Sequence, residues 1–277
     1  MLDNEVCIVT AFKDLGRENW TGVKNGQVIP GYIKRTREQY FERFKRLTKL
    51  NNTIVCYIED ELYDELSTYV GDRPNVRYIS MNKMDYCIDG YYASLVKQID
   101  KVQKSPALVD FVDNKSAPEY WNAEYVAINF LKSFFVDYTI IHQKDLEHNE
   151  FAWIDFGYCR EDRDVEEGKT FCFKSDGKLN FFANGQFPLE YIQNVPILNL
   201  IKTGKVIIQG CHFIGDRYAF TALKQMMKHH LYKLLSIGLV DDDQTLLFMF
   251  YRESPTLCRL IYNDPMDWFS VIRKNLV

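Results

Sequence analysis

The first third of the chain alternates short apolar runs with amphipathic segments. Residues 5–12, 53–58 and 76–81 are apolar and rich in β-branched side chains, a composition typical of buried strands. Between them, apolar residues recur at helical intervals over residues 40–50 and again over residues 61–70, which is the pattern of amphipathic helices. The order strand, helix, strand, helix, strand favours right-handed crossovers and a mostly parallel sheet.

A long helix is the clearest feature of the remaining sequence. Ser116-Ala-Pro-Glu119 has the form of a capping box with a proline in the first turn, and a helical pattern follows over residues 119–136. Further on, a hairpin is predicted around Ser175-Asp176-Gly177, which separates the short runs 170–173 and 178–183. The other predicted elements are strands at residues 151–156, 205–209 and 246–252 and a helix at residues 218–235.

The chain is predicted to form a single α/β domain over residues 1–277. No internal repeat, low-complexity stretch or linker interrupts it, and 47% apolar with 26% charged residues is an ordinary globular composition. The aromatic fraction is high at 15%. However, rings such as Tyr40, Phe44, Tyr125 and Phe135 fall at the spacing of buried helix faces, so most of this excess is assigned to packing.

Charge and hydropathy narrow the function classes. A net charge of −4 makes nonspecific capture of nucleic acid a poor prediction, because that affinity comes mainly from Lys and Arg. The apolar runs are far shorter than a membrane span, and the acidic N-terminus is unlike a signal peptide. The seven cysteines, Cys87 among them, are scattered without metal-finger spacing. We therefore expect a cytoplasmic protein with reduced thiols and at most peripheral contact with the inner face of the membrane.

Asp155 is the first candidate for chemistry, because it lies where the predicted strand at residues 151–156 ends and runs into Phe156-Gly157. In open α/β sheets, ligands bind beyond the carboxyl ends of the strands, and an acid there is placed to hold a divalent metal or a ribose hydroxyl. The alternative is an aspartate that caps the following turn.

The segment Thr10–Arg17 places Lys13, Asp14 and Arg17 just after the first strand. A cation at this position can neutralise a diphosphate, and Asp14 can hydrogen-bond a ribose or base. The segment is neither a G-x-G-x-x-G loop nor a P-loop, so a dinucleotide-binding protein and an ATPase are not supported. The alternative is a charged surface turn.

Two later segments also carry candidate residues. His212 lies between Gly210 and Gly215, where glycines permit close approach of a ligand; the alternative is a tight turn with a half-buried histidine. In the run Asp241–Asp243, converging carboxylates would raise a pKa toward that of a general base, whereas the alternative is a solvated loop or helix N-cap.

The adjacent pair His229-His230 is predicted to be structural. The two residues lie within the helix predicted at residues 218–235. Neighbouring residues on a helix point about 100° apart, so the pair does not have the usual i, i+4 metal-binding spacing.

Taken in order, the motifs resemble those of one family. The segments are TAFKDLGR, TIVCYIED, PEYWNAEY, FAWIDFGYCR, QGCHFIG and DDDQTLL, and together they resemble the HtrL/YibB family, a poorly characterised group associated with lipopolysaccharide and surface-glycan loci. That family is similar to nucleotide-sugar glycosyltransferases of the GT-A fold. The resemblance covers nearly all of the chain and implies a nucleotide-binding half over about residues 1–115 and a metal- and acceptor-binding half over about residues 116–277.

The resemblance also assigns residues to roles by their position. It gives the nucleotide to the end of the first strand, at Thr10, Ala11, Phe12, Lys13 and Arg17. It gives a divalent Mn²⁺ or Mg²⁺ ion to Asp155 and the catalytic roles to Asp242 and Asp243. Contacts with the sugar or acceptor fall to Trp153, Gly210, His212, Gly215 and Gln244.

One departure from the family pattern bears on the metal. The D-x-D motif of these glycosyltransferases reads Asp155-Phe156-Gly157 here, and no histidine follows His230. Lys13 or Arg17 is then an alternative source of charge for the leaving diphosphate.

The sequence-based expectation is a glycosyltransferase. It moves a hexose-type sugar from a nucleotide diphosphate donor, with UDP the expected nucleotide, to a hydroxyl of a surface glycan or glycolipid. The alternative is a non-catalytic glycan-binding or assembly protein on the same fold. A nucleotidyltransferase is disfavoured because the chain lacks a glycine- and lysine-rich phosphate loop near its N-terminus.

Overall fold

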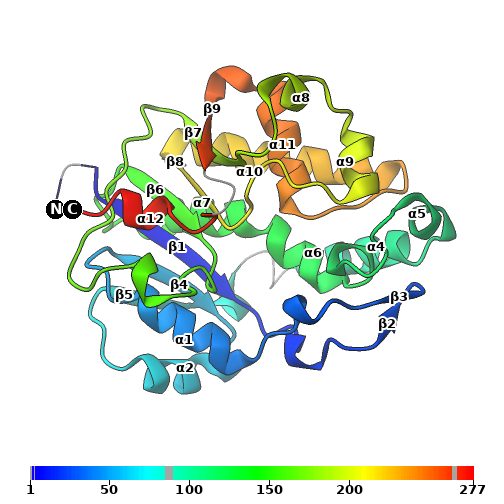
Figure 1. Ribbon diagram of the computed structural model, residues 1–277. Coiled ribbons are helices and arrows are strands. Elements are labelled where there is room, and N and C mark those ends of the chain that lie inside the picture. Colours follow the sequence, from blue (N-terminus) through cyan, green and yellow to red (C-terminus); the bar gives the residue numbers. More distant parts are fainter. Residues whose placement is uncertain (1, 3, 85–89, 264–266) are drawn as a thin grey trace.

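The computed structural model describes residue 2 and residues 4–84, 90–263 and 267–277, and it is an α/β structure built on a seven-stranded sheet (Figure 1). Its strand order is β5-β4-β1-β6-β8-β7-β9. The strands are β1 (Val6–Phe12), β4 (Ile54–Ile58), β5 (Val76–Ser80), β6 (Glu150–Ile154), β7 (Leu179–Asn184), β8 (His212–Asp216) and β9 (Cys258–Asn263). A separate two-stranded sheet pairs β2 (Val23–Lys24) with β3 (Gln27–Val28).

The central sheet is mostly parallel, as the sequence predicted. Strands β5, β4, β1 and β6 pair in parallel, and so do β7 and β9, whereas β8 runs antiparallel to both of its neighbours. After β1 the chain continues to β4 on one side, and it returns to β6 on the other side of β1. This change of direction is a topological switch point, the place where open α/β sheets bind ligands.

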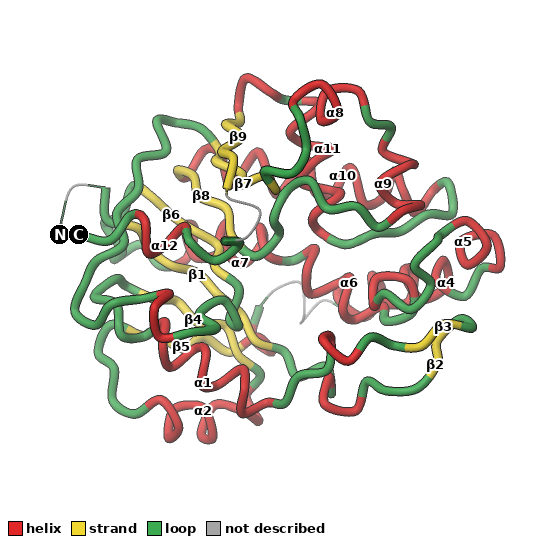
Figure 2. The backbone as a smooth tube through the Cα atoms, viewed as in Figure 1, coloured by secondary structure: helices red, strands yellow, loops and turns green. Residues whose placement is uncertain are grey.

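Helices cover both faces of the sheet (Figures 1 and 2). Val6 and Ile8 of β1 belong to one buried core with α1 (Arg37–Leu47), α2 (Tyr63–Val70) and α12 (Val271–Lys274). Cys7 and Val9 belong to a second core on the opposite face. The helices of that core are α4 (Tyr91–Gln103), α5 (Pro106–Phe111), α6 (Ala123–Phe130), α7 (Lys132–His142), α8 (Leu189–Asn194), α9 (Ile197–Thr203), α10 (Arg217–Ser236) and α11 (Asp243–Glu253).

The connections include short 3₁₀ turns at Arg17–Asn19, Gly31–Ile33, Asp60–Leu62, Met81–Lys83, Pro118–Tyr120, Asp162–Asp164 and Pro255–Leu257. Six of the cysteines lie in the described part of the chain and are free thiols, while Cys87 lies outside it. Among the residues described, the helices are all too short or too polar to cross a bilayer.

The helix predicted over residues 119–136 is wrong in its start and its continuity. The Ser116 side chain does not cap it; a 3₁₀ turn occupies Pro118–Tyr120, and Trp121 leaves the helical conformation. The first α-helix here is α6, whose N-cap Asn122 accepts a hydrogen bond from the Tyr125 backbone N–H at 2.9 Å. The chain then passes through Leu131 into α7, so the apolar pattern spans two helices.

Three predicted strands are also wrong. Residues 246–252 lie in α11, which is buried on all sides from Leu246 to Phe250, so its apolar run has no helical period. Residues 205–209 do not form a strand. Ile208 makes one isolated bridge, with Ala183, and the next strand, β8, begins at His212. The run 170–173 makes only isolated bridges, with Glu5 and Leu276.

The predicted hairpin is therefore absent, although its turn is present. Asp176 and Gly177 both have positive φ, at 54° and 72°. The run after the turn becomes β7, which pairs with β8 and β9 rather than with the run before it. Long-range pairing with the rest of the sheet decides the partner here, because it buries β7 on both faces.

Candidate functional site

A cleft of about 650 Å³ opens at the switch point of the sheet. Its walls come from segments far apart in the chain: the loop after β1, the loop after β6, the N-terminal end of α7 and the N-terminal end of α11. The carboxyl ends of β1 and β6 both reach this edge because the two strands are parallel neighbours. The cleft thus lies where ligand binding is expected for this type of sheet.

Lys132 connects the β6 side of the cleft with the α11 side. Its Nζ atom lies 3.0 Å from Asp155 Oδ1 and 3.0 Å from Asp243 Oδ2, and it donates a hydrogen bond of 2.9 Å to the Gly210 carbonyl. The side chain is only 7% exposed. A buried ammonium is costly unless it is paired, and here two carboxylates and a carbonyl surround it. These two carboxylates raise the pKa of Lys132 above its ordinary value, so it remains charged.

Asp155 has a second partner on its own strand. Its Oδ1 accepts a hydrogen bond of 2.8 Å from the indole N–H of Trp153, two residues earlier. The Asp155 backbone N–H donates to the Cys211 carbonyl at 2.8 Å, which fixes the loop after β6 against the segment before β8. Asp155 is therefore held in place by neighbours on three different segments.

The acidic run Asp241–Asp243 forms the N-terminal end of α11. Asp242 is the N-cap, and its Oδ1 accepts a hydrogen bond from the Gln244 backbone N–H at 3.0 Å. Asp241 is buried and accepts from the Thr245 hydroxyl at 2.7 Å. Burial raises the pKa of Asp241 to about 6, and burial together with Asp241 raises that of Asp242 to about 7. Both interpretations of this run, a helix cap and a group with a raised pKa, hold for Asp242.

Glu119 adds a further carboxylate to this acidic wall and also lines the cleft. Burial raises its pKa well above the ordinary value, and Asp242 and Asp241 raise it further. The pKa of Asp243 is also raised, by burial and by Asp242, while the Lys132 ammonium opposes the shift. Lys132 is the cation that lowers the pKa of both Asp242 and Asp243.

The loop after β1 forms the opposite wall. The Arg17 guanidinium donates to the Tyr40 hydroxyl at 2.7 Å and twice to the Ile33 carbonyl, at 3.1 and 2.8 Å. It also lies 5.0 Å from the Trp20 ring. Lys13 forms an ion pair of 2.6 Å with Glu59. Arg17 thus presents a fixed cation beside aromatic rings.

A group of three arginines, Arg35, Arg43 and Arg160, lies next to the loop after β6. Arg35 and Arg160 line the cleft. Burial and the charges of Arg35 and Arg160 lower the pKa of Arg43 to about 10, and Nη1 of Arg43 is buried without a hydrogen-bond partner. Burial and Arg35 also lower the pKa of Arg160.

The negative charge near the arginine group acts at a longer range than an ion pair, since Asp155 raises the pKa of Arg160 without pairing with it. In the part of the chain that the structure describes, the arginines with ion pairs are Arg37, Arg46, Arg73, Arg77, Arg163, Arg259 and Arg273. None of the three in this group is among them. Three guanidinium groups that repel one another, one of them with a buried and unpartnered Nη1 atom, form an environment suited to an anion.

Most of the residues that the sequence analysis selected line this cleft. They are Ala11, Phe12, Lys13, Arg17, Trp153, Asp155, Gly210, Asp242, Asp243 and Gln244. The sheet topology brings the residues beside β1, β6 and β8 to one edge, and the packing of α11 brings Asp242, Asp243 and Gln244 to the same place. The remaining three, Thr10, His212 and Gly215, do not line it.

His212 faces the core instead of the cleft. It is fully buried between the rings of Tyr158 and Phe182, at centroid distances of 5.4 and 4.5 Å. Burial lowers its pKa to about 3, so the ring is neutral. The expectation of a glycine-flanked loop fails because His212 is the first residue of β8, paired in register with Ile154 on the α1 side of the sheet.

Thr10 and Gly215 are interior strand positions. Thr10 is fully buried within β1, paired in register with Cys56. At Gly215, a Cβ atom would lie 2.9 Å from Leu179 Cδ1 and 3.2 Å from Ala219 Cβ. Gly215 therefore permits α10 to pack against the sheet, which accounts for the glycine without a ligand.

Sequence reasoning missed Lys132 and the arginine group. Lys132 carries a recognisable signal, since it is a lone cation inside the apolar segment of residues 126–136. Such a lysine is rarely buried unless it is paired. The arginines carry no comparable signal, because arginines on an amphipathic helix and in polar loops are ordinarily solvated.

A family model and a relative in Escherichia coli agree on the family. A family model described as a bacterial protein of unknown function, HtrL_YibB, matches residues 4–274. The chain is 26% identical to Protein HtrL of Escherichia coli (strain K12) over 276 residues, covering 98% of this chain and 93% of that protein. Among solved structures, 4-diphosphocytidyl-2C-methyl-D-erythritol synthase from Anaerococcus prevotii is similar at a TM-score of 0.35 and 12% identity, over 94% of this chain and 88% of that one. The chain therefore belongs to the HtrL/YibB family of bacterial proteins.

Proposed function

We propose that the protein is a glycosyltransferase that moves a hexose-type sugar from a nucleotide diphosphate donor, UDP-linked, to a hydroxyl of a glycan or glycolipid. The observation that carries this proposal is the bridge of Lys132 between Asp155 and Asp243 inside the cleft. It places carboxylates from the end of β6 and from α11 around one space at the ligand-binding edge of the sheet. The resemblance of the family to nucleotide-sugar glycosyltransferases supports the same reaction.

The donor would lie between the loop after β1 and the arginine group. Ala11, Phe12 and Arg17 line the part of the cleft suited to a nucleoside, where aromatic rings surround the Arg17 guanidinium. Arg35 and Arg160 line the cleft beside the loop after β6 and would neutralise the diphosphate. Binding of the diphosphate would also relieve the repulsion within the arginine group.

Asp242 is the best candidate for the base that receives the acceptor proton. It is half-buried and lines the cleft, and its pKa of about 7 suits proton transfer near neutral pH. In the transfer, the bond from the sugar C1 to the diphosphate oxygen breaks and its electron pair leaves on the diphosphate. A bond forms from C1 to the acceptor oxygen, and the hydroxyl proton passes to Asp242. Asp243 is buried and would act as a positioning residue through Lys132.

The donor set at Asp155 does not fit the divalent metal that the resemblance implies. The Lys132 ammonium already occupies the space between Asp155 and Asp243, and Oδ1 of Asp155 also accepts the Trp153 indole N–H. Gly157 stands where a second acid would be. Among the described residues, these carboxylates do not converge with a third ligand. We infer that Lys132 and the arginines supply the positive charge at this site.

Calorimetric titration with UDP- and GDP-sugars, followed by an assay of donor hydrolysis, tests the proposal. We expect a UDP-sugar to bind and to be hydrolysed slowly, equally well in EDTA and in Mn²⁺. Asp242→Asn should lower turnover by about 100-fold or more, since removing a positioned base costs roughly that factor. Asp155→Asn should also lower turnover, because it removes one carboxylate that holds Lys132 in the cleft. Asp100→Asn is the matched control, because Asp100 is half-buried on α4, lies outside the cleft and pairs with Lys104.

Two outcomes would contradict the proposal. If no nucleotide sugar binds, the cleft is not a donor site. If a nucleotide sugar binds but neither variant changes its slow turnover, the protein is a binding protein rather than a transferase.

A further inference from the structure

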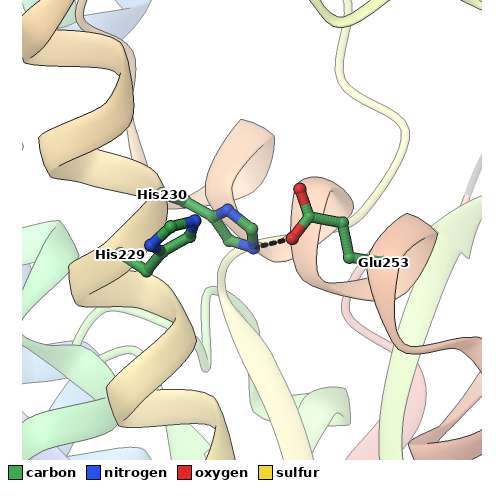
Figure 3. A group of neighbouring side chains, drawn as sticks. All are labelled: His229, His230 and Glu253. Atoms are coloured by element: carbon green, nitrogen blue, oxygen red, sulfur yellow. Dashed lines mark ion pairs between the residues drawn. The ribbon is translucent and has the colours of Figure 1, made fainter.

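A second cluster of candidate ligands lies at the other end of α11, where it packs on α10. It consists of His229 and His230 from α10 and Glu253 from the last turn of α11 (Figure 3). One ligand atom of each residue lies within 4.8 Å of those of the other two. Among the described residues, this is the one group of three His, Cys, Asp or Glu side chains whose ligand atoms lie this close together.

The adjacent histidines converge in spite of their positions on one helix. Their backbone directions differ by about 100°, yet the two ring centroids are 5.5 Å apart. In Figure 3 the His230 ring lies between the His229 ring and the Glu253 carboxylate. The sequence-based expectation that the pair is only structural did not include the third residue, which comes from another helix.

His230 has an unusual environment for a purely structural residue. Its side chain is fully buried, and neither ring nitrogen has a hydrogen-bond partner. Nε2 faces Glu253 Oε2 at 3.8 Å, which is too long for a hydrogen bond. A buried polar group without a partner costs free energy, so a ligand for Nε2 would stabilise the fold.

We propose that His229, His230 and Glu253 bind a Zn²⁺ ion, with Nε2 of His230 and Oε2 of Glu253 as two of the ligand atoms. Two imidazoles and one carboxylate are a common zinc donor set. Zinc bonds of about 2.0–2.1 Å place tetrahedral ligand atoms about 3.4 Å apart. His229 and Glu253 are both exposed, so a small rotation of their side chains brings the ligand atoms to this separation.

The His230 ring is in the protonation state that a metal requires. Burial lowers the pKa of His230 to about 4 even though Glu253 raises it, so the ring is neutral and able to donate a lone pair. Lys233 contacts the other carboxylate oxygen of Glu253, Oε1, at 3.3 Å. It would therefore orient the carboxylate while leaving Oε2 for the ion.

Zinc at this position would join α10 to the C-terminal end of α11. Asp243, at the other end of α11, lies in the cleft about 15 Å away along the helix, at 1.5 Å per residue. The site is separate from the proposed transferase chemistry, so it can be tested independently.

Calorimetric titration of the metal-free protein with ZnCl₂ alone, together with thermal unfolding, tests this proposal. We expect one equivalent of Zn²⁺ to bind and to raise the Tm, while Mg²⁺ does neither. His229→Gln and Glu253→Gln should each weaken binding by tenfold or more. His142→Gln is the control, because His142 is exposed on α7 and outside the cluster.

The variants change exposed side chains, so folding of both can be checked by their Tm without metal. Stoichiometric binding that both variants lose, with His142→Gln unchanged, supports the site. Absence of stoichiometric binding, or binding that survives in both variants, overturns it.

Discussion

Lys132 and Asp243 form an ion pair of 3.0 Å between α7 and α11, and their side chains are only 7% and 3% exposed. Such a pair gains little over an apolar pair of the same shape, because both groups lose their hydration. Loss of one partner is different, since it leaves the other charge buried without compensation. We therefore explain the presence of this ion pair by the way Lys132 positions Asp155 and Asp243 in the cleft, and not by a gain in the stability of the fold.

Lys132→Met is expected to destabilise the protein by about 3–5 kcal/mol, the range measured when one partner of a buried pair is removed. Denaturant unfolding measures this effect. Lys104→Met is the control, because the exposed Lys104–Asp100 pair contributes little. A stability change for Lys132→Met as small as that of the control would mean that Lys132 is not buried between the two carboxylates.

Gly210→Ala is expected to disrupt the site without changing a charge. A Cβ atom at this position would lie 2.5 Å from Asp243 Oδ2 and 2.9 Å from its Cγ, so the carboxylate must move away from Lys132. We expect donor turnover to fall by about tenfold or more, since misplacement by an ångström costs up to about 100-fold. Gly31→Ala is the control and should retain full turnover, because a Cβ atom added at Gly31 meets nothing within 4 Å. Equal turnover in both variants would contradict the role of Asp243.

Arg43→Gln and Arg160→Gln are expected to separate stability from binding. The Arg43 guanidinium is partly buried among like charges and does not line the cleft, so its loss should raise the Tm of the ligand-free protein. Arg160 lines the cleft, so Arg160→Gln should weaken binding of UDP or pyrophosphate by about tenfold or more, because a charged hydrogen bond contributes about 1.5–3 kcal/mol. Arg77→Gln serves as the control, since Arg77 has its own partner in Asp145. Unchanged binding of both anions by Arg160→Gln would contradict the assignment of the arginine group as their site.

The pH dependence of Asp242 has a defined sign. Its pKa is raised from 3.8 to about 7, so between these values the folded protein binds more protons than the unfolded chain. Its contribution to stability is therefore present below pH 3.8 and is lost as the pH rises through about 7. Asparagine at position 242 preserves the helix cap but does not titrate. As the pH rises from about 3.8 to about 7, the free energy of unfolding of Asp242→Asn should therefore increase relative to that of the parent. Denaturant unfolding at several pH values measures it, and a constant difference would contradict the raised pKa.

Activity should depend on Asp242 in the opposite direction. A general base must be deprotonated, so donor turnover should rise with pH through about 7. In Asp242→Asn this rise should disappear. If the rise persists in the variant, another group titrates.

His212→Leu is expected to leave donor and acceptor binding within about twofold of the parent. The histidine is buried with Nε2 unpartnered, so leucine should preserve or increase the Tm. A loss of tenfold or more in acceptor affinity, measured by saturation kinetics, would restore the role that the sequence resemblance gave to this residue.

The pattern of the first third of the chain was sufficient to predict β1, α1, β4, α2 and β5, because their apolar residues follow one another or recur at the spacing of a strand or a helix. The position of Asp155 was also predictable, since a carboxylate after a buried apolar run must lie at the end of a strand. The later elements were harder to predict. The apolar run in α11 reads as a strand because a helix buried on all sides has no polar face.

The sequence by itself determined the fold class, the family and the segments that end at the ligand-binding edge of the sheet, because these depend on local hydrophobic patterns and on motifs. Only the tertiary structure decided which side chains meet there. His212 was removed from the cleft by the pairing register of β8, and Lys132 was brought to Asp155 and Asp243 by the packing of α7 and α11. Local patterns specify which positions are buried, whereas pairing and packing between distant segments specify their neighbours.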